Sequence, residues 1–129
     1  MQEFTLEGAN LYNMNKSLVA QEKPLDHIAL GVALAKIANW FQRSRAKYFM
    51  LLCHENRDYT LFNFVYIHDP ADHSHYLHAA EELEECLVNR GKVISIEYQE
   101  EEDAWEIWIN DGEPKVYYLF KYDMGVIEV

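Results

Sequence analysis

The sequence predicts an α+β domain in which an antiparallel sheet of about five strands packs with two helices, in the order α-β-β-α-β-β-β. Two observations carry this prediction. Apolar residues recur at helical spacing in two separate stretches, and β-rich runs are joined to their neighbours by short polar turns. Short connections favour antiparallel pairing, because parallel neighbours need a long crossover. With 129 residues and 50% apolar content, residues 1–129 are expected to form a single domain.

The amino-terminal part is predicted to contain an irregular arm with one helical turn, followed by the first long helix. Residues 1–24 show no sustained period, and Pro24 then favours a helix start, so a helix is predicted from Leu25 to about Ala46. Its main apolar face has spacings of three and four: Leu30, Leu34, Ile37 and Phe41. A second apolar stripe lies opposite: Leu25, Ile28, Ala29 and Val32. We therefore expect the arm or a second copy of the chain to cover this helix.

Two β-rich runs follow the first helix and predict a hairpin. They span residues 48–54 and 59–67 and are separated by the polar turn ENRD. The second helix is indicated by a further apolar stripe: Leu77, Ala80, Leu83 and Leu87. Its start is assigned to Asp69 as N-cap, with Pro70 at the first helical position and Asp72 at the third. Gly91 is expected to end it.

Three further strands are predicted after the second helix, over residues 92–99, 104–110 and 115–122, with turns at EEED and at Asp111-Gly112. In the middle strand Trp105, Ile107 and Ile109 share one face, and Ala104, Glu106 and Trp108 share the other. Both faces of the sheet are rich in apolar residues. Either helices cover both faces, or one face is an interface, which would suit a homodimer.

The net charge of −11 is unevenly distributed along the chain. Residues 1–64 sum to +1, whereas residues 65–129 sum to −12. Such a field repels phosphate backbones and anionic lipid surfaces and attracts basic surfaces. Direct nucleic-acid binding is therefore disfavoured, apart from a small basic patch of Arg43, Arg45 and Lys47. A basic protein surface is the expected partner.

The sequence has neither a secretory leader pattern nor an apolar run of about 18 residues, so we expect a cytoplasmic protein that does not enter a membrane. Cys53 lies in an apolar run and Cys86 in a glutamate-rich helix. Two cysteines in such different settings are expected to be free thiols.

A histidine-rich stretch, IHDPADHSHYLH, covers residues 67–78 and raises the question of a metal site. On the predicted helix His73 points to the core with Leu77. His75 and His78 lie on the outer face, which they share with Glu82, Glu85 and Cys86. The weak metal candidates are His75, His78 and Glu82, ligand types at helical spacings of three and four. One helix face seldom supplies enough ligands, and no second cluster exists, so a solvated polar face is the favoured interpretation and no cofactor is predicted.

Catalytic motifs are scarce. The glycines are scattered, which excludes a GxGxxG turn and a P-loop. Ser74 is flanked by histidines, but adjacent helical residues point apart, so neither can activate it. Cys53 and His54 are neighbours on a strand and point to opposite faces. The prediction is that the protein is not an enzyme.

Ten carboxylates fall within residues 81–106, on the second helix and around the following hairpin. One interpretation is solvation, with charged turns that keep edge strands from pairing with other chains. The other is that they imitate a nucleic-acid backbone and occupy a basic groove, with Tyr98 and Trp108 as apolar anchors. The predicted partner-binding residues are Glu81, Glu82, Glu85, Glu97, Glu100, Glu101, Glu102, Asp103, Glu106 and Trp108.

In size, acidity and aromatic content the chain resembles small proteins encoded on bacterial phages and mobile elements, some of which inhibit host defence nucleases. This resemblance covers no motif and transfers no functional residue. Three hypotheses follow. The first is a non-catalytic acidic inhibitor or adaptor that binds a nucleic-acid-handling protein. The second is an oligomeric structural or assembly protein that uses an apolar sheet face. The third is a small metal-binding protein or enzyme centred on the histidines.

Overall fold

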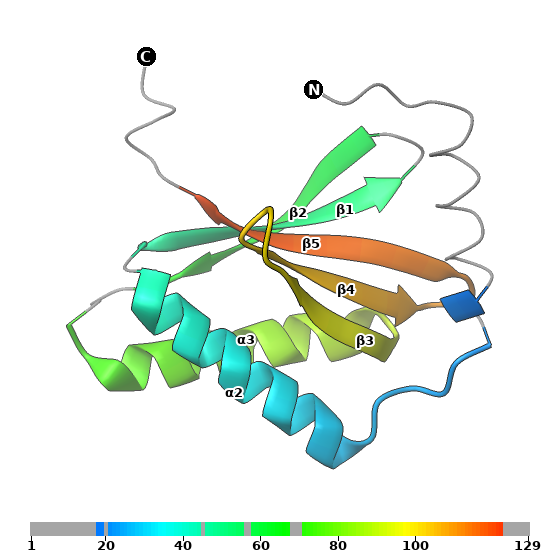
Figure 1. The fold of residues 1–129 in the computed structure, drawn as a ribbon, viewed down its shortest axis with the longest axis horizontal. Coiled ribbons are helices and arrows are strands. Elements are labelled where there is room, and N and C mark those ends of the chain that lie inside the picture. The colour runs from blue at the N-terminus through cyan, green and yellow to red at the C-terminus, as the bar shows by residue number, and fades with distance from the viewer. Residues whose placement is uncertain (1–17, 20, 45, 56–57, 68–70, 123–129) are drawn as a thin grey trace.

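The computed structural model describes residues 18–19, 21–44, 46–55, 58–67 and 71–122, without the side chains of Glu55 and His73 (Figure 1). Within these ranges the chain forms α2 (His27–Ser44), β1 (Tyr48–Glu55), β2 (Asp58–Tyr66), α3 (His73–Arg90), β3 (Lys92–Gln99), β4 (Ala104–Asn110) and β5 (Pro114–Tyr122). This order confirms the predicted α+β class. The predicted arm over residues 1–24 falls largely outside the described residues.

All strand pairs are antiparallel, and the strand order in the sheet is β2-β1-β5-β4-β3. Consecutive strands are neighbours in each hairpin, as the short turns predict. Among the described strands, the one long-range pairing joins β1 to β5, for example Leu51 to Leu119. It connects the β1–β2 hairpin to the β3–β4–β5 meander and leaves β2 and β3 as the edge strands.

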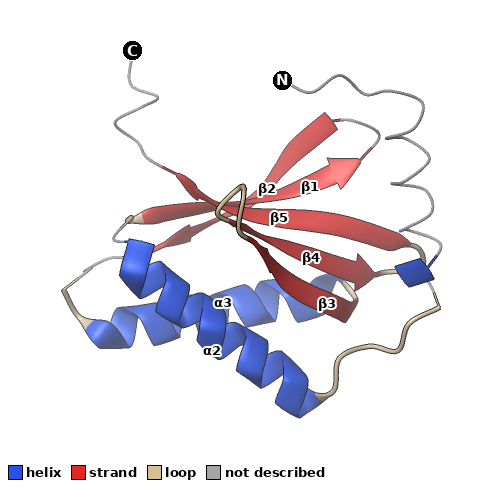
Figure 2. Ribbon diagram, in the orientation of Figure 1, coloured by secondary structure: helices blue, strands red, loops and turns tan. Residues whose placement is uncertain are grey.

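Helices α2 and α3 lie on the same side of the sheet (Figure 2). Neither described helix has the length and apolar character needed to cross a membrane. Helix α2 begins after Asp26, whose carboxylate accepts a hydrogen bond from the amide of Ala29 at 2.7 Å. That side-chain acceptor satisfies one of the amides that a helix start leaves without a partner.

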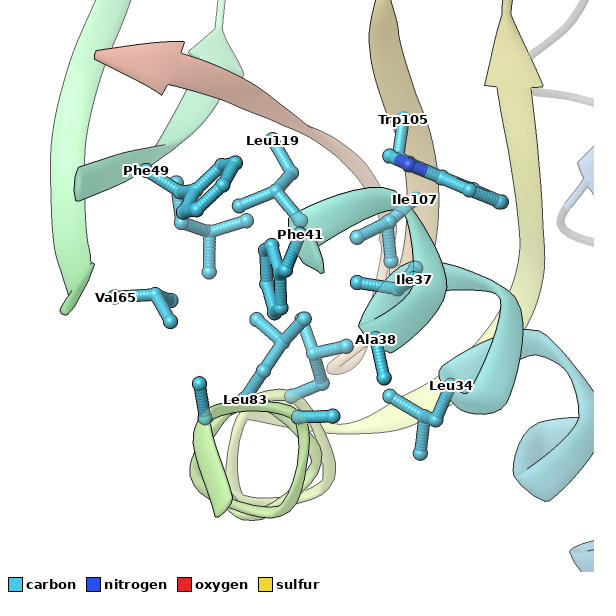
Figure 3. Packing of buried hydrophobic residues seen from close by; sticks show 14 of the residues in the cluster. Leu34, Ile37, Ala38, Phe41, Phe49, Val65, Leu83, Trp105, Ile107 and Leu119 are labelled. Atoms are coloured by element: carbon cyan, nitrogen blue, oxygen red, sulfur yellow. The ribbon is translucent and has the colours of Figure 1, made fainter. Parts of the chain in front are cut away.

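The core lies between the two helices and one face of the sheet. Figure 3 shows Phe41 of α2 close to Phe49 of β1 and Leu119 of β5, with Leu83 of α3 below it. The rings of Phe41 and Phe49 are 4.3 Å apart. Trp105, predicted to share a face with Ile107 and Ile109, is buried with them in the same cluster. This packing, rather than helix propensity, provides most of the stability of such short helices.

The start of α3 differs from the prediction. Asp72 is the N-cap, and not the third helical residue, because its carboxylate accepts hydrogen bonds from the amide and hydroxyl of Ser74 at 3.0 and 2.7 Å. Asp69 and Pro70 lie outside the described residues. The helix does end at Gly91 as expected.

The inner face of α3 is rotated from the predicted stripe. Leu77 is 61% exposed, and Tyr76 is buried in its place, together with Ala79, Ala80, Leu83 and Leu87. The placement of Cys86 on the outer face was also wrong. Cys86 packs against the core, and the side-chain amide of Asn63 in β2 donates a 3.6 Å hydrogen bond to its sulfur.

Two register irregularities change which residues face the helices. The β1–β2 register shifts between Leu51 and Leu52, so Phe62 packs against the core whereas Phe64 does not. The β3–β4 register shifts between Val93 and Ser95. As a result, Ile94 lies on the sheet face that points away from the helices, whereas Ile96 packs against the core. A bulge inserts one residue and so reverses the alternation beyond it.

Neither α2 nor α3 covers the second sheet face, and we call it the open face. Part of it is covered, because Val19 packs with Ile94, Trp108 and Val116. The rest carries aromatic and acidic side chains. The second stripe of α2 is likewise not fully covered by described residues, with Ile28 77% exposed. The interpretation that the two long helices sandwich the sheet is therefore wrong, because α2 and α3 lie on one side of it and only the helical residues 18–19 among the described residues lie on the other.

Gly91 sits where α3 passes into β3, against the β4–β5 turn. A β-carbon at this position would lie 2.9 Å from the carbonyl carbon of Asn110 and 3.0 Å from Cα of Asp111. These are backbone atoms that cannot rotate away. The close approach therefore requires glycine.

We expect Gly91→Ala to lower the free energy of unfolding by about 1 to 3 kcal/mol, through the backbone shifts it forces. The matched control is Gly31→Ala on α2, where nothing lies within 4 Å of the added β-carbon. That change should raise stability by up to about 1 kcal/mol through helix propensity. Urea unfolding followed by tryptophan fluorescence measures both. Equal effects of the two substitutions would contradict the proposed contact.

Candidate functional site

The structure separates the predicted partner-binding acids into two groups on opposite layers. The first group, Glu81, Glu82 and Glu85, is exposed on α3. Glu81 also lines a groove of about 260 Å³ between α2 and α3. The second group belongs to the β3–β4 hairpin. Because the sheet lies between α3 and the open face, the structure does not bring these carboxylates together into one continuous surface.

On the hairpin, the acids occupy the turn and the open face. Glu100, Glu101 and Glu102 are exposed in the turn. Glu97 and Glu106 lie directly opposite each other in the β3–β4 register, so their side chains share the open face. Two like charges directly opposite on neighbouring strands repel each other. This hairpin carries six carboxylates, two more than α3.

The carboxylate of Glu106 is held in place by its neighbours on the open face. It accepts a hydrogen bond from the indole nitrogen of Trp108 at 3.0 Å and another from the hydroxyl of Tyr118 at 3.0 Å. Both donors are neutral. Glu106 is therefore fixed in orientation while its charge stays uncompensated by these two contacts.

The two predicted apolar anchors have different surroundings. Trp108 is only 5% exposed and packs beneath Val19 and Ile94, so its ring is not available to a partner. Tyr98 is 42% exposed and lies on the helix side of the sheet, in contact with Trp105. Its hydroxyl donates a 2.6 Å hydrogen bond to Asp103, and this bond to the carboxylate is the main reason that the pKa of Tyr98 is raised.

Asp103 is a structural residue, unlike the three glutamates before it in the turn. Its carboxylate accepts hydrogen bonds from the indole nitrogen of Trp40 at 2.8 Å and from Tyr98, and it pairs with Lys121 at 2.6 Å. These contacts join the turn to α2, β3 and β5. They lower the pKa of Asp103 to about 2, with the Lys121 contact the largest cause. The backbone of Asp103 adopts a φ of 50°, a conformation that Asp tolerates better than most residues.

A group of aromatic residues on the open face was not singled out from the sequence. His54 of β1 stacks on Tyr59 of β2, with centroids 4.5 Å apart and planes 9° apart. Tyr59 also contacts Tyr118 of β5 at 6.0 Å. Burial lowers the pKa of His54, and burial together with the nearby charge of Glu102 raises the pKa of Tyr59. The period-two pattern of β1, β2 and β5 is the sequence signal that could have grouped them.

Only two of the three weak metal candidates, His78 and Glu82, lie close to each other on α3. His78 lies 3.7 Å from Glu82, and His75 lies 3.6 Å from Asp72, the helix cap. His75 is thus directed to the cap, away from the other two. Among the described residues, no three His, Cys, Asp or Glu side chains converge as metal ligands. His68 and the side chain of His73 are outside the described set, so the absence of a metal site stays a prediction. Both cysteines are free thiols.

Comparisons with protein-family models, with curated proteins and with solved structures give no match for this chain.

We expect Asp103→Asn to lower the free energy of unfolding near pH 7 by about 1 to 2 kcal/mol, a range kept small because the Asp103 side chain is 40% exposed. The pKa in the folded chain is about 2 and its ordinary value is 3.8. The stabilisation is therefore fully present above pH about 4 and is lost as the pH falls toward about 2. Urea unfolding of both proteins across this range measures it, with Glu101→Gln as control. A difference that stays constant with pH would contradict the assignment.

Proposed function

We propose that this chain is a non-catalytic acidic binding protein, an inhibitor or adaptor, whose partner is a basic surface of a nucleic-acid-handling protein such as a host defence nuclease. The observation that carries the proposal is the β3–β4 hairpin with its uncompensated carboxylates. Its five glutamates have no Lys or Arg ion pair within the described residues: Glu97, Glu100, Glu101, Glu102 and Glu106. A basic surface would supply the missing cations.

The rigidity of the hairpin supports the same proposal. The turn is held to the body of the domain through Asp103, and β4 is buried along most of its length. A charged surface on a rigid element loses little conformational entropy when it binds, so more of the electrostatic attraction is retained as affinity. Long-range attraction of this kind accelerates association and weakens as salt is added.

The charge-reversal variant that tests this proposal is Glu100→Lys, Glu101→Lys, Glu102→Lys. Asp103 is left unchanged because it supports the fold. The matched control is Glu81→Lys, Glu82→Lys, Glu85→Lys, which makes the same charge change on α3. Proteins captured from a bacterial lysate by the wild type should be retained by the control and lost by the hairpin variant. With a captured partner in hand, the association rate should fall about tenfold or more from low to physiological salt.

Two results would contradict the proposal. One is a hairpin variant that captures the same partner as tightly as the wild type. The other is binding that does not depend on salt, since exposed charges are screened beyond about 8 Å at physiological ionic strength. Circular dichroism of both triple variants shows that the fold is intact before binding is compared.

A second candidate function, an oligomeric structural or assembly protein, is favoured by the apolar part of the open face. Leu61 is 48% exposed and Phe64 is 44% exposed, and both lie on the edge strand β2. An edge strand with exposed apolar side chains is a site for pairing with another chain. Self-association through β2 would leave the acidic hairpin, at the other edge of the sheet, accessible.

Under this second function, the wild type is a dimer and Leu61→Lys with Phe64→Lys is a monomer, because two charges would be buried at the interface without partners. Light scattering coupled to size-exclusion chromatography measures both masses. The control is Val88→Lys, which changes a similarly exposed apolar residue on α3 and should leave the mass unchanged. A wild type that elutes with the mass of one chain at micromolar concentrations would exclude this function for the isolated protein.

A further inference from the structure

The open face contains a small pocket whose lining is aromatic and acidic. Its volume is about 160 Å³, large enough for the charged end of one side chain. It is formed where β2, β5 and β4 approach the β3–β4 turn. The residues that line it are Tyr59, Gln99, Glu102, Glu106, Tyr118 and Phe120.

Three rings provide the aromatic walls. Tyr118 contacts Tyr59 with centroids 6.0 Å apart and planes tilted by 59°, and it contacts Phe120 at 6.0 Å with a tilt of 31°. The ring of His54 stacks on the ring of Tyr59 and supports it. The face of an aromatic ring carries a negative quadrupole, which attracts a cation within about 6 Å of the centroid. Several rings around one space are the arrangement that holds organic cations.

The carboxylates add negative charge to the same pocket. Glu106 is held toward the open face by Tyr118 and Trp108, and Glu102 enters from the turn. Glu97 lies directly across the β3–β4 pair from Glu106 and increases the local repulsion. Among the described residues no Lys or Arg lines the pocket. A bound cation would relieve the repulsion as well as contact the rings.

We propose that this pocket binds the ammonium or guanidinium group of a lysine or arginine side chain presented by a protein partner. The inference rests on the proposed function, because it assigns the site at which the basic partner inserts one residue. Hydrogen bonds from the cation to Glu102 and Glu106 set its position, and the rings of Tyr59, Tyr118 and Phe120 contact it. A bare metal ion fits less well, because Ca²⁺ and Mg²⁺ take six or more oxygen ligands and this lining is half aromatic.

The experiment is an NMR titration of the isotopically labelled full chain with methylguanidinium chloride and with n-butylammonium chloride. The neutral probe n-butanol and sodium chloride serve as matched controls. We expect saturable shifts confined to the pocket residues and to the indole N–H of Trp108, which reports on Glu106. Shifts of the same size with n-butanol, or shifts that follow ionic strength alone, would overturn the proposal.

The variants are Glu106→Gln and Glu102→Gln, with Glu82→Gln on α3 as control. Each pocket variant should weaken binding of the cation probes about two- to fivefold, the effect of one partly exposed charge, and the control should not. Glu102 is exposed in the turn, so its variant remains informative if Glu106→Gln disturbs the hydrogen bonds of the open face. Unchanged affinity in Glu102→Gln would count against the pocket.

The outcomes for the pocket and for the proposed function are distinguishable. If the cation probes bind as expected and no basic partner is captured through the hairpin, the pocket stands and the partner proposal fails. If a basic partner is captured equally by wild type and by a Glu102→Gln, Glu106→Gln variant, the partner proposal stands and the pocket is not its contact site. Loss of capture in that variant, with Glu82→Gln unaffected, supports both.

Discussion

The structure depends on one constraint, which is that both helices bury their apolar faces against the same side of the sheet. Phe41 of α2 and Leu83 of α3 meet Phe49 and Leu119 of the sheet in a single cluster. A strand alternates its side chains between two faces, so the residues between these core positions must point away from the helices. The aromatic and acidic character of the open face therefore follows from where the helices pack. Glu97 and Glu106 of the hairpin and Leu61 and Phe64 of β2 lie on the open face as a consequence of that arrangement.

The strands and their order along the chain could be predicted from the sequence because they depend on local chemistry, whereas the β1–β5 pairing was not predicted. Alternating apolar residues and turn residues such as Asp111-Gly112 act within a few positions, and Gly112 indeed has a φ of 122°. The side of the sheet on which each helix packs could not be predicted in this way. Both arrangements satisfy the same apolar pattern, and only the packing of distant segments decides between them.

Neither the register irregularities nor the contacts of the site could be predicted from the sequence, because both depend on packing between distant segments. The shift near Val93 that turns Ile94 to the open face depends on how β3 fits β4, which no local pattern specifies. From the sequence alone, Asp103 cannot be distinguished from the other acids of the turn, because its partners Trp40 and Lys121 lie far away in the sequence. The predicted acids were correctly located on α3 and on the hairpin. Their separation by the sheet required the fold.

The strand order also determines which strand pairing costs the most conformational entropy to form. Among the described strands, three pairings join consecutive strands, and only β1 with β5 closes a loop of many residues. The entropy lost in closing a loop grows with the logarithm of its length, so this pairing is the most costly to form. It is also the joint between the nearly neutral first half and the strongly acidic second half of the chain. The pairing and packing around Leu51 and Leu119 thus join the β1–β2 hairpin and the β3–β4–β5 meander into one sheet.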